Sequence, residues 1–191
     1  MDQFHAVLLG AIQGLTEVLP ISSSGHLILI PYLLGWPESG LTFDVALHLG
    51  TMLALCTYFW RDIVELIFNF FTSISTKGPR TPQQRLPFYI IAGTVPAAIV
   101  GKMFEETIDI VFRSSPFLIA AFLIGFGLLL AFADTMGAKR WKIERFTLVN
   151  AIAVGLAQCL ALIPGVSRSG ITITAALLLG YNRESAAKFS F

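Results

Sequence analysis

Long apolar segments separated by short polar stretches follow one another along the whole chain. Residues 117–133, for example, contain no charged side chain. A helix of that length is about 25 Å long, which is close to the thickness of the hydrocarbon core of a bilayer. The pattern predicts an all-α membrane protein, a polytopic bundle with membrane helices at residues 4–21, 45–60, 86–101, 117–133 and 146–163.

Two other apolar segments, residues 27–34 and 171–179, are too short to cross a bilayer. Each directly follows a polar stretch that contains glycine, at residues 22–26 and 167–170. A helix, a polar break and a half-length helix is the pattern of a re-entrant hairpin. Broken backbone is tolerated inside a membrane only where protein or a water-filled cavity satisfies its polar groups. The sequence therefore predicts two re-entrant helix-break-helix segments.

The two breaks resemble each other in sequence. Residues 14–25 contain Gly-Leu, then Pro, then a Ser-x-Ser-Gly stretch, and residues 155–170 repeat that order with a short insertion. An internal repeat with interrupted helices in both halves indicates a binding site near the middle of the membrane. We therefore predict an internal repeat within a single membrane domain. Its parts are repeat 1 at about residues 1–75 with the re-entrant motif at 13–34, connecting spans at about 86–133, and repeat 2 from about 146.

The second copy stops soon after its break, at residue 191, whereas the first continues through a further apolar segment. The sequence thus predicts a chain that is incomplete at its C-terminus, a piece of a longer protein.

Composition supports a membrane protein. Hydrophobic residues make up 55% of the chain and charged residues 13%, and the mean hydropathy is +0.74. Soluble domains carry about 25% charged residues, so an ordinary soluble enzyme, a disordered chain and a disulfide scaffold are excluded. The net charge of +1 argues against a nucleic-acid partner. Cys56 and Cys159 lie in apolar segments and show no spacing typical of zinc ligands.

Basic residues gather in two loops, one containing Lys77, Arg80 and Arg85 and the other at residues 139–145. Two predicted spans separate these loops, so they should lie on the same side of the membrane. The positive-inside rule makes that side cytoplasmic. A third loop is expected between Lys102 and Arg113, where Glu105, Glu106 and Asp109 balance the charge.

The first break carries the groups of a reactive site. A carboxylate inside a membrane helix, such as Glu17, costs about 2.5–3.5 kcal/mol and is a functional candidate by default. Gln13 lies four residues earlier on the same helix face. The serine-rich stretch 22–26 can cradle phosphate with backbone amides, and a serine there becomes a nucleophile if His26 or Glu17 acts as its base. The plainer alternative is a structural polar contact between helices.

The second break adds a cation. Arg168 follows a long apolar segment, and a guanidinium makes forked contacts to phosphate. The plainer alternative is an arginine whose charged end reaches the membrane interface. If the two breaks converge, a carboxylate can hold Mg²⁺ or Ca²⁺ against phosphate oxygens while arginine stabilises the developing charge. These groups together favour cleavage of a lipid phosphate ester or phosphoanhydride.

At these residues the sequence resembles the undecaprenyl-pyrophosphate phosphatase family associated with bacitracin resistance. The first motif of that family is Glu or Gln, three residues and Glu, which is present at residues 13–17 and is followed by Leu-Pro-Ile-Ser-Ser-Ser-Gly-His at 19–26. The second motif, Pro-Gly-x-Ser-Arg-Ser-Gly, is present at 164–170. Both motifs match without departure and in the expected order.

The resemblance implies a fold, an activity and a location. The family removes the terminal phosphate of undecaprenyl diphosphate, a polyprenyl diphosphate lipid, and so regenerates the carrier for peptidoglycan synthesis. It requires a divalent cation, and its fold is an interlocked inverted repeat. Its members are multi-pass proteins of the bacterial plasma membrane whose active site opens to the outer face. They are longer than 191 residues, which agrees with an incomplete chain.

The resemblance also assigns roles to residues. Glu17 is the functional carboxylate and metal ligand, Ser23 the catalytic serine, His26 the catalytic histidine and Arg168 the group that grips phosphate. The remaining candidates are expected to bind substrate: Gln13, Ser22, Ser24, Gly25, Ser167, Ser169 and Gly170.

Other interpretations stay open. Transporters also place half-length helices at the midplane, so the same groups could carry a polyprenyl phosphate or an anion without hydrolysis. The acid-phosphatase-like lipid phosphatases are set aside because no histidine follows Arg168. His48 is expected to be a core or interface residue with Asp44 as its partner. The sequence does not decide between serine and water as the nucleophile, or whether the protein is a homo-oligomer.

Overall fold

The structure is a computed structural model that describes residues 3–37, 39–79, 81–112 and 115–191, without the side chains of 105–112. The described chain is helical and contains no strand, which confirms the predicted all-α class. Its helices are α1 (Gln3–Val18), α2 (Ser23–Leu34), α3 (Leu41–Tyr58), α4 (Trp60–Ser75), α5 (Pro82–Phe112), α6 (Pro116–Met136), α7 (Leu148–Gln158), α8 (Arg168–Leu178) and α9 (Arg183–Ser190), with 3₁₀ turns η1 (Ile143–Arg145) and η2 (Cys159–Leu162).

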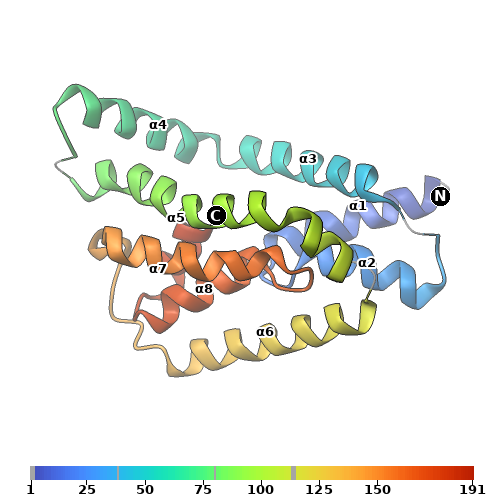
Figure 1. Cartoon of the computed structure of the whole chain (residues 1–191). Helices are drawn as coiled ribbons and strands as arrows, with labels where there is room; N and C mark the ends of the chain where they lie inside the picture. Colours follow the sequence, from blue (N-terminus) through green and yellow to red (C-terminus); the bar gives the residue numbers. More distant parts are fainter. Residues whose placement is uncertain (1–2, 38, 80, 113–114) are drawn as a thin grey trace.

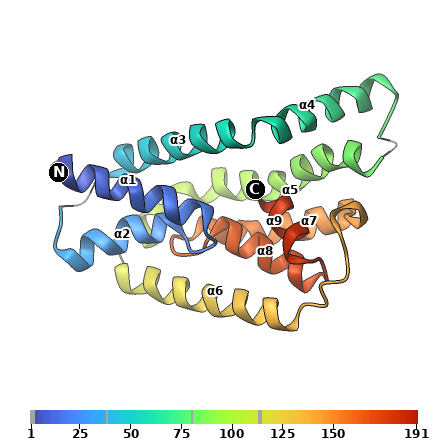
Figure 2. The same ribbon diagram turned by 180° about the vertical axis from the view of Figure 1, so that it is seen from behind.

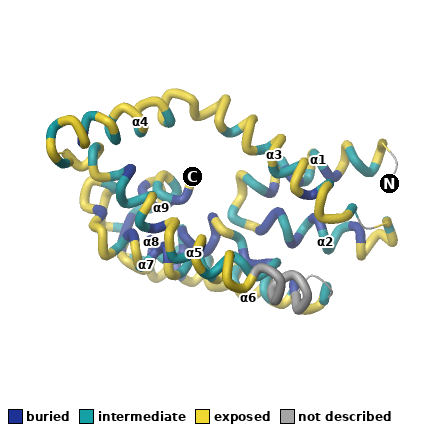
Figure 3. Tube along the Cα trace, turned by 45° about the horizontal axis from the view of Figure 1, so that its top comes forward, coloured by how far each residue is buried: buried dark blue, intermediate teal, exposed yellow. Residues whose placement is uncertain are grey.

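Three helices are long and apolar enough to cross a membrane: α3, the part of α5 at Pro82–Phe104, and α6. At most 17% of each apolar window is buried inside the protein. Figure 3 shows the exposed positions along the outer helices, with the buried ones gathered around α7 and α8. An apolar surface of this extent needs lipid around it, so the chain is a multi-pass membrane protein.

Two of the five predicted spans are shorter than expected. α1 has 16 residues and ends before Pro20, which has no backbone N–H with which to continue the helix. α7 has 11 residues and tightens into η2. The backbone is then extended at Ile163, because the residue before a proline avoids the helical region. Both shortened helices therefore lead directly into the predicted breaks.

One predicted loop is instead helical, and one helix was not predicted. The loop expected between Lys102 and Arg113 is helical as far as Phe112, because α5 continues past its apolar part. The side chains of Glu105, Glu106 and Asp109, and the whole of Arg113, lie outside the described residues. The span expected at 45–60 is α3, which is followed at Trp60 by the unpredicted helix α4. Figure 1 shows α3 and α4 nearly in line.

The two breaks touch each other in the middle of the molecule, where the α1–α2 and α7–α8 hairpins meet (Figures 1 and 2). A Cβ added at Gly25 would lie 3.3 Å from the Cα of Gly165. A Cβ added at Gly170 would lie 3.1 Å from the carbonyl oxygen of Pro20. Glycine at these positions thus lets the backbones of the two breaks approach each other closely.

Gly165 also packs against α6, and this contact gives a stability prediction. Its φ is +96°, and an added Cβ would lie 2.5 Å from the carbonyl oxygen of Ile119. We expect Gly165→Ala to lower the free energy of unfolding by about 2–4 kcal/mol, because left-handed strain and overpacking add. Thermal unfolding in detergent measures the effect. Gly14→Ala is the matched control, since nothing lies within 4 Å of an added Cβ there. Equal stability of the two variants would contradict the prediction.

The core that supports the second break lies between α7, α8 and α9. Phe146 stacks on Phe189 with ring centroids 4.2 Å apart, and Tyr181 lies beside it at 4.5 Å. The Tyr181 hydroxyl donates to the carbonyl oxygen of Arg145 and accepts from Asn150. These contacts fix the far end of α8 and leave its N-terminus at the break.

The two basic loops lie at the same end of the molecule, as predicted. The connection between α4 and α5 and the connection between α6 and α7 are together in both views (Figures 1 and 2). Arg80, one of the basic residues assigned to the first loop, lies outside the described residues.

Candidate active site

Two helix N-termini meet at the breaks, and they are capped in the same way. Ser22 precedes α2, and its hydroxyl accepts a hydrogen bond from the Gly25 amide at 3.3 Å. Ser167 precedes α8, and its hydroxyl accepts from the Gly170 amide at 3.0 Å. The N-terminus of a helix carries a partial positive charge and free amide donors. Two such ends at one place favour the binding of an anion.

Within this shared frame, Ser23 and Arg168 occupy equivalent positions, each being the first residue of its helix. In both copies the capping serine also lies close to the serine two residues after it. The oxygens of Ser22 and Ser24 are 3.5 Å apart, and those of Ser167 and Ser169 are 3.2 Å apart. One local structure therefore presents a hydroxyl from the first break and a guanidinium from the second.

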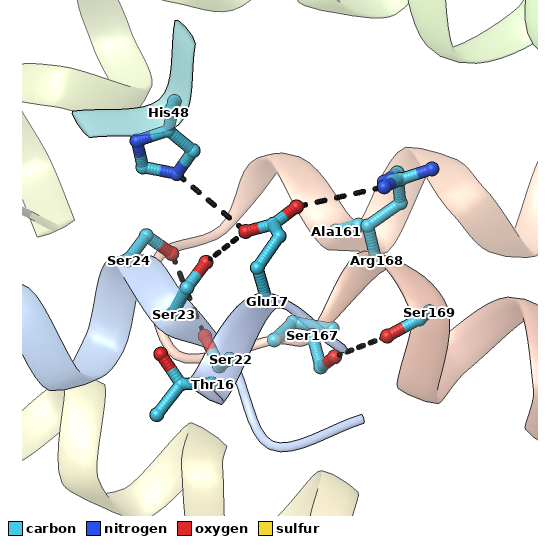
Figure 4. A pocket seen from close by; sticks show the side chains of 11 residues that line it. Thr16, Glu17, Ser22, Ser23, Ser24, His48, Ala161, Ser167, Arg168 and Ser169 are labelled. Atoms are coloured by element: carbon cyan, nitrogen blue, oxygen red, sulfur yellow. Dashed lines mark hydrogen bonds and ion pairs between the residues drawn. The ribbon is translucent and has the colours of Figure 1, made fainter. Parts of the chain in front are cut away.

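Glu17 connects the two breaks (Figure 4). Its Oε2 accepts hydrogen bonds from the Ser23 hydroxyl at 2.6 Å and from Gln13 Nε2 at 3.1 Å. Its Oε1 lies 3.6 Å from Arg168 Nη2. The bond from Gln13 confirms that these two side chains share a face of α1. The Glu17 carboxylate is therefore held by a neutral hydroxyl on one side and a guanidinium on the other.

Arg168 is also held from a second direction, since its Nη1 donates to the carbonyl oxygen of Ser190 at 3.4 Å. Its side chain is still about half exposed, at 51%. A guanidinium with donors left free can contact a bound anion as well as Glu17.

A cavity of about 180 Å³ opens between these groups. Seven of the eleven predicted site residues line it: Glu17, Ser22, Ser23, Ser24, Ser167, Arg168 and Ser169. Figure 4 shows their side chains converging from α1, α2 and α8. The remaining lining residues are Thr16, His48, Ala161 and Val166.

The other four predicted residues lie behind the cavity wall. Gly25 and Gly170 are at the contact between the breaks, where their backbones need the space. Gln13 is completely buried behind Glu17. His26 does not line the cavity, because its Nδ1 lies 2.7 Å from the carbonyl oxygen of Ser22 and the ring follows the first turn of α2. The side chain in contact with the Ser23 hydroxyl is thus that of Glu17 and not that of His26.

His48 reaches the cavity from α3, whereas a core or interface position was expected. Its Nε2 lies 3.9 Å from Glu17 Oε2. Its other ring nitrogen lies 2.8 Å from the carbonyl oxygen of Asp44, so Asp44 is a partner through its backbone. The carboxylate of Asp44 accepts from Ser39. A lone ionisable side chain in an apolar span was the signal that could have identified His48.

Two side chains at the site offer oxygen atoms suited to a hard cation, Glu17 in the cavity wall and Gln13 buried behind it. Gln13 Oε1 is buried and has no hydrogen-bond partner among the described residues, beside the carboxylate of Glu17. Among the described residues, no three His, Cys, Asp or Glu side chains lie together in a way that could hold a metal ion by themselves. Mg²⁺ is often bound by one or two protein oxygens together with substrate phosphates. The residues present therefore fit a cation that is shared with a phosphate ligand.

Comparison with known proteins agrees with this site. The family described as bacitracin resistance protein BacA matches residues 6–191. A protein of Geotalea daltonii named undecaprenyl-diphosphatase is 72% identical over the whole chain, which covers 71% of that relative. Proteins of the same name from Geobacter metallireducens and Moorella thermoacetica are 66% and 51% identical over the same shares. The match extends over both motifs and all spans, and the chain therefore belongs to the BacA family of bacitracin resistance proteins.

Proposed function

We propose that this chain is an undecaprenyl-diphosphatase, a hydrolase that cleaves the phosphoanhydride bond of undecaprenyl diphosphate. The products are undecaprenyl phosphate, which returns to peptidoglycan synthesis, and orthophosphate. Regenerating the carrier removes the diphosphate lipid and so confers bacitracin resistance. The observation that carries the proposal is the Ser23 hydroxyl, 2.6 Å from Glu17 in a cavity that Arg168 also lines. The names of the relatives support it.

The cavity suits the diphosphate group in size and charge. Its volume of about 180 Å³ is the volume that roughly six water molecules occupy in the liquid, which is comparable with the size of a diphosphate group. The N-termini of α2 and α8 supply amide and hydroxyl donors. Arg168 supplies a charged fork for the terminal phosphate oxygens. The apolar chain of the lipid stays in the surrounding membrane.

The contact between Ser23 and Glu17 provides the first chemical step. Ser23 gives its proton to Glu17 Oε2, and the serine oxygen forms a bond to the terminal phosphorus. The bond from that phosphorus to the bridging oxygen breaks, and undecaprenyl phosphate leaves with the electron pair. The leaving phosphate takes up the proton that Glu17 received, so the carboxylate is free again. Water then gives a proton to Glu17 while its oxygen bonds to the phosphorus of the phosphoserine. The bond from that phosphorus to the serine oxygen breaks, orthophosphate leaves, and Glu17 returns the proton to the serine oxygen. Arg168 stabilises the charge on the transferred phosphoryl group throughout.

The proposal includes a divalent cation, Mg²⁺ or Ca²⁺. Glu17 and Gln13 would hold it, since they offer a carboxylate and a buried amide oxygen without a partner among the described residues. Bound beside the diphosphate, such an ion neutralises charge on the phosphate oxygens.

We also propose how the chain lies in the membrane. The segments α1–α2 and α7–η2–α8 are the two re-entrant hairpins of an inverted repeat, and their matched caps support this. The protein lies in the bacterial plasma membrane. The end with the two basic loops faces the cytoplasm, and the cavity opens to the outer face.

Orthophosphate release from undecaprenyl diphosphate in detergent tests the function. We expect the full-length protein to release phosphate and a chelator to abolish the release. Arg168→Ala should lower kcat/KM by about 10²–10³-fold, as expected for the loss of a group that stabilises transition-state charge. A folded protein that binds the lipid but releases no phosphate would instead be a carrier or transporter.

A further inference from the structure

We propose that His48 is a positioning residue, which holds the Glu17 carboxylate in the orientation that accepts the Ser23 proton. This inference rests on the proposed hydrolase function and adds a third element, α3, to its site. Neither of the two sequence motifs includes His48, which lies 22 residues or more from each of them.

The ring of His48 is fixed between two oxygens. A carbonyl oxygen only accepts hydrogen bonds, so the ring nitrogen beside Asp44 carries the hydrogen and donates to it at 2.8 Å. That bond directs the opposite nitrogen, Nε2, into the cavity, where it lies 3.9 Å from Glu17 Oε2. This separation is close enough for an ion pair and too long for a direct hydrogen bond. Figure 4 shows the ring approaching Glu17 from the side opposite Arg168.

The residue that holds the ring is itself anchored. Asp44 lies in the first turn of α3, is 8% exposed, and accepts a hydrogen bond from Ser39 at 2.7 Å. The carbonyl oxygen that receives the His48 hydrogen bond therefore belongs to a fixed turn. His48 is consequently restrained although its side chain is 41% exposed.

His48 adds a third neighbour to Glu17 Oε2, besides Ser23 and Gln13. Glu17 lies in the last turn of α1, one residue before the helix ends, and its Oε1 is attracted by Arg168 at 3.6 Å. Rotation of the carboxylate toward the guanidinium would remove Oε2 from the Ser23 hydroxyl. When Nε2 carries a hydrogen as well as Nδ1, His48 is a cation, and the N–H next to Oε2 opposes that rotation by attracting this oxygen. His48 and Arg168 thus hold the two oxygens of one carboxylate in separate places.

Two amide substitutions distinguish the contributions of the two ring nitrogens of His48. In His48→Gln the side-chain amide nitrogen extends as far as Nε2, so it can still approach Glu17. In His48→Asn the amide extends only as far as Nδ1, so it can bind the Asp44 carbonyl but cannot approach Glu17. We expect His48→Asn to lower kcat by roughly 10- to 100-fold, since misplacement of a catalytic group by about 1 Å can have an effect of that size. KM should stay within about twofold, and His48→Gln should restore kcat to within about threefold of the wild type.

His5→Asn is the matched control, because the same exchange is made in α1 at a histidine that stacks on Trp36 and is outside the cavity. An unchanged kcat in His48→Asn would overturn the inference, and so would a His48→Gln variant as slow as His48→Asn. A loss confined to KM would overturn it too, because it would make His48 a substrate-binding group. Any of these results with an active wild type leaves the hydrolase function intact. A wild type that releases no phosphate removes the proposed function itself.

Discussion

Replacing Ser23 with alanine is expected to reduce kcat by about a thousandfold or more, since removal of a nucleophile abolishes the covalent route and leaves only binding and electrostatic stabilisation. The reason is the short hydrogen bond that the Ser23 hydroxyl donates to Glu17 at 2.6 Å, which directs the serine proton toward its acceptor. The initial rate of orthophosphate release from undecaprenyl diphosphate measures the loss. Acid quenching of the wild type during turnover should in addition trap phosphate on Ser23, detectable by mass spectrometry.

Ser24→Ala is the matched comparison, because it removes a hydroxyl one position along the same helix. The Ser24 oxygen lies 3.5 Å from that of Ser22, and Figure 4 shows no interaction between Ser24 and Glu17. We expect Ser24→Ala to lower kcat by less than about tenfold, as for one neutral hydrogen bond. Near-full turnover by Ser23→Ala would remove serine as the nucleophile and favour direct attack by water that Glu17 activates.

The candidate site could be predicted largely because ionisable groups are expensive in a membrane. Glu17 and Arg168 stand out from apolar segments, and the structure places them 3.6 Å apart although they are far apart in the sequence. The convergence of the two breaks followed from their similarity, since repeats with interrupted helices meet at a common site. The prediction of His26 as base or acid rested only on its residue type and its place next to the serines, and neither of these indicates where its ring points. The backbone oxygen of Ser22 binds its ring instead.

Helix lengths were predicted less well, because hydropathy does not report where the backbone can start or stop a helix. The apolar segment at 4–21 continues past Pro20, but the helix α1 ends at Val18, because backbone chemistry and not polarity stops it. Conversely, α5 continues to Phe112 through polar residues that form helices readily in water. His48 was assigned to a core or interface position, since a single histidine in an apolar span does not reveal which neighbour it faces. Only the packing of α3 beside α1 brings it to Glu17.

The matched caps of α2 and α8 explain how one repeated structure supports unlike chemistry. Each break uses a capping serine and a glycine three residues later to expose the first residue of a helix. In the first copy this residue is Ser23, which is small and can approach a phosphorus atom. In the second it is Arg168, which is long and charged. Divergence at this one position would turn a symmetric anion site into an asymmetric site with an attacking group and a stabilising group.

Glu17→Gln is expected to lower kcat by about 10³–10⁴-fold, near the upper range for the loss of a general base. The substitution keeps the size of the side chain, and its amide oxygen can still accept a hydrogen bond from Ser23. The loss of kcat therefore reports the missing proton acceptor and the missing negative charge. The substitution also removes the anion that pairs with Arg168 and lies beside His48, so the guanidinium is left without this partner. Orthophosphate release at saturating lipid measures kcat, and the KM from the same titration reports whether the cavity still binds.

Glu65→Gln controls for the exchange itself, since Glu65 is an exposed residue of α4 and lies outside the cavity. Its rate should equal that of the wild type. If Glu17→Gln retained more than about a tenth of the wild-type kcat, proton transfer to Glu17 would not be needed. The 2.6 Å bond to Ser23 would then serve only to orient the hydroxyl, and another acceptor for its proton would have to lie in the cavity. A large loss shared by Ser23→Ala and Glu17→Gln, without further loss in the double variant, would show that the two side chains act as one unit.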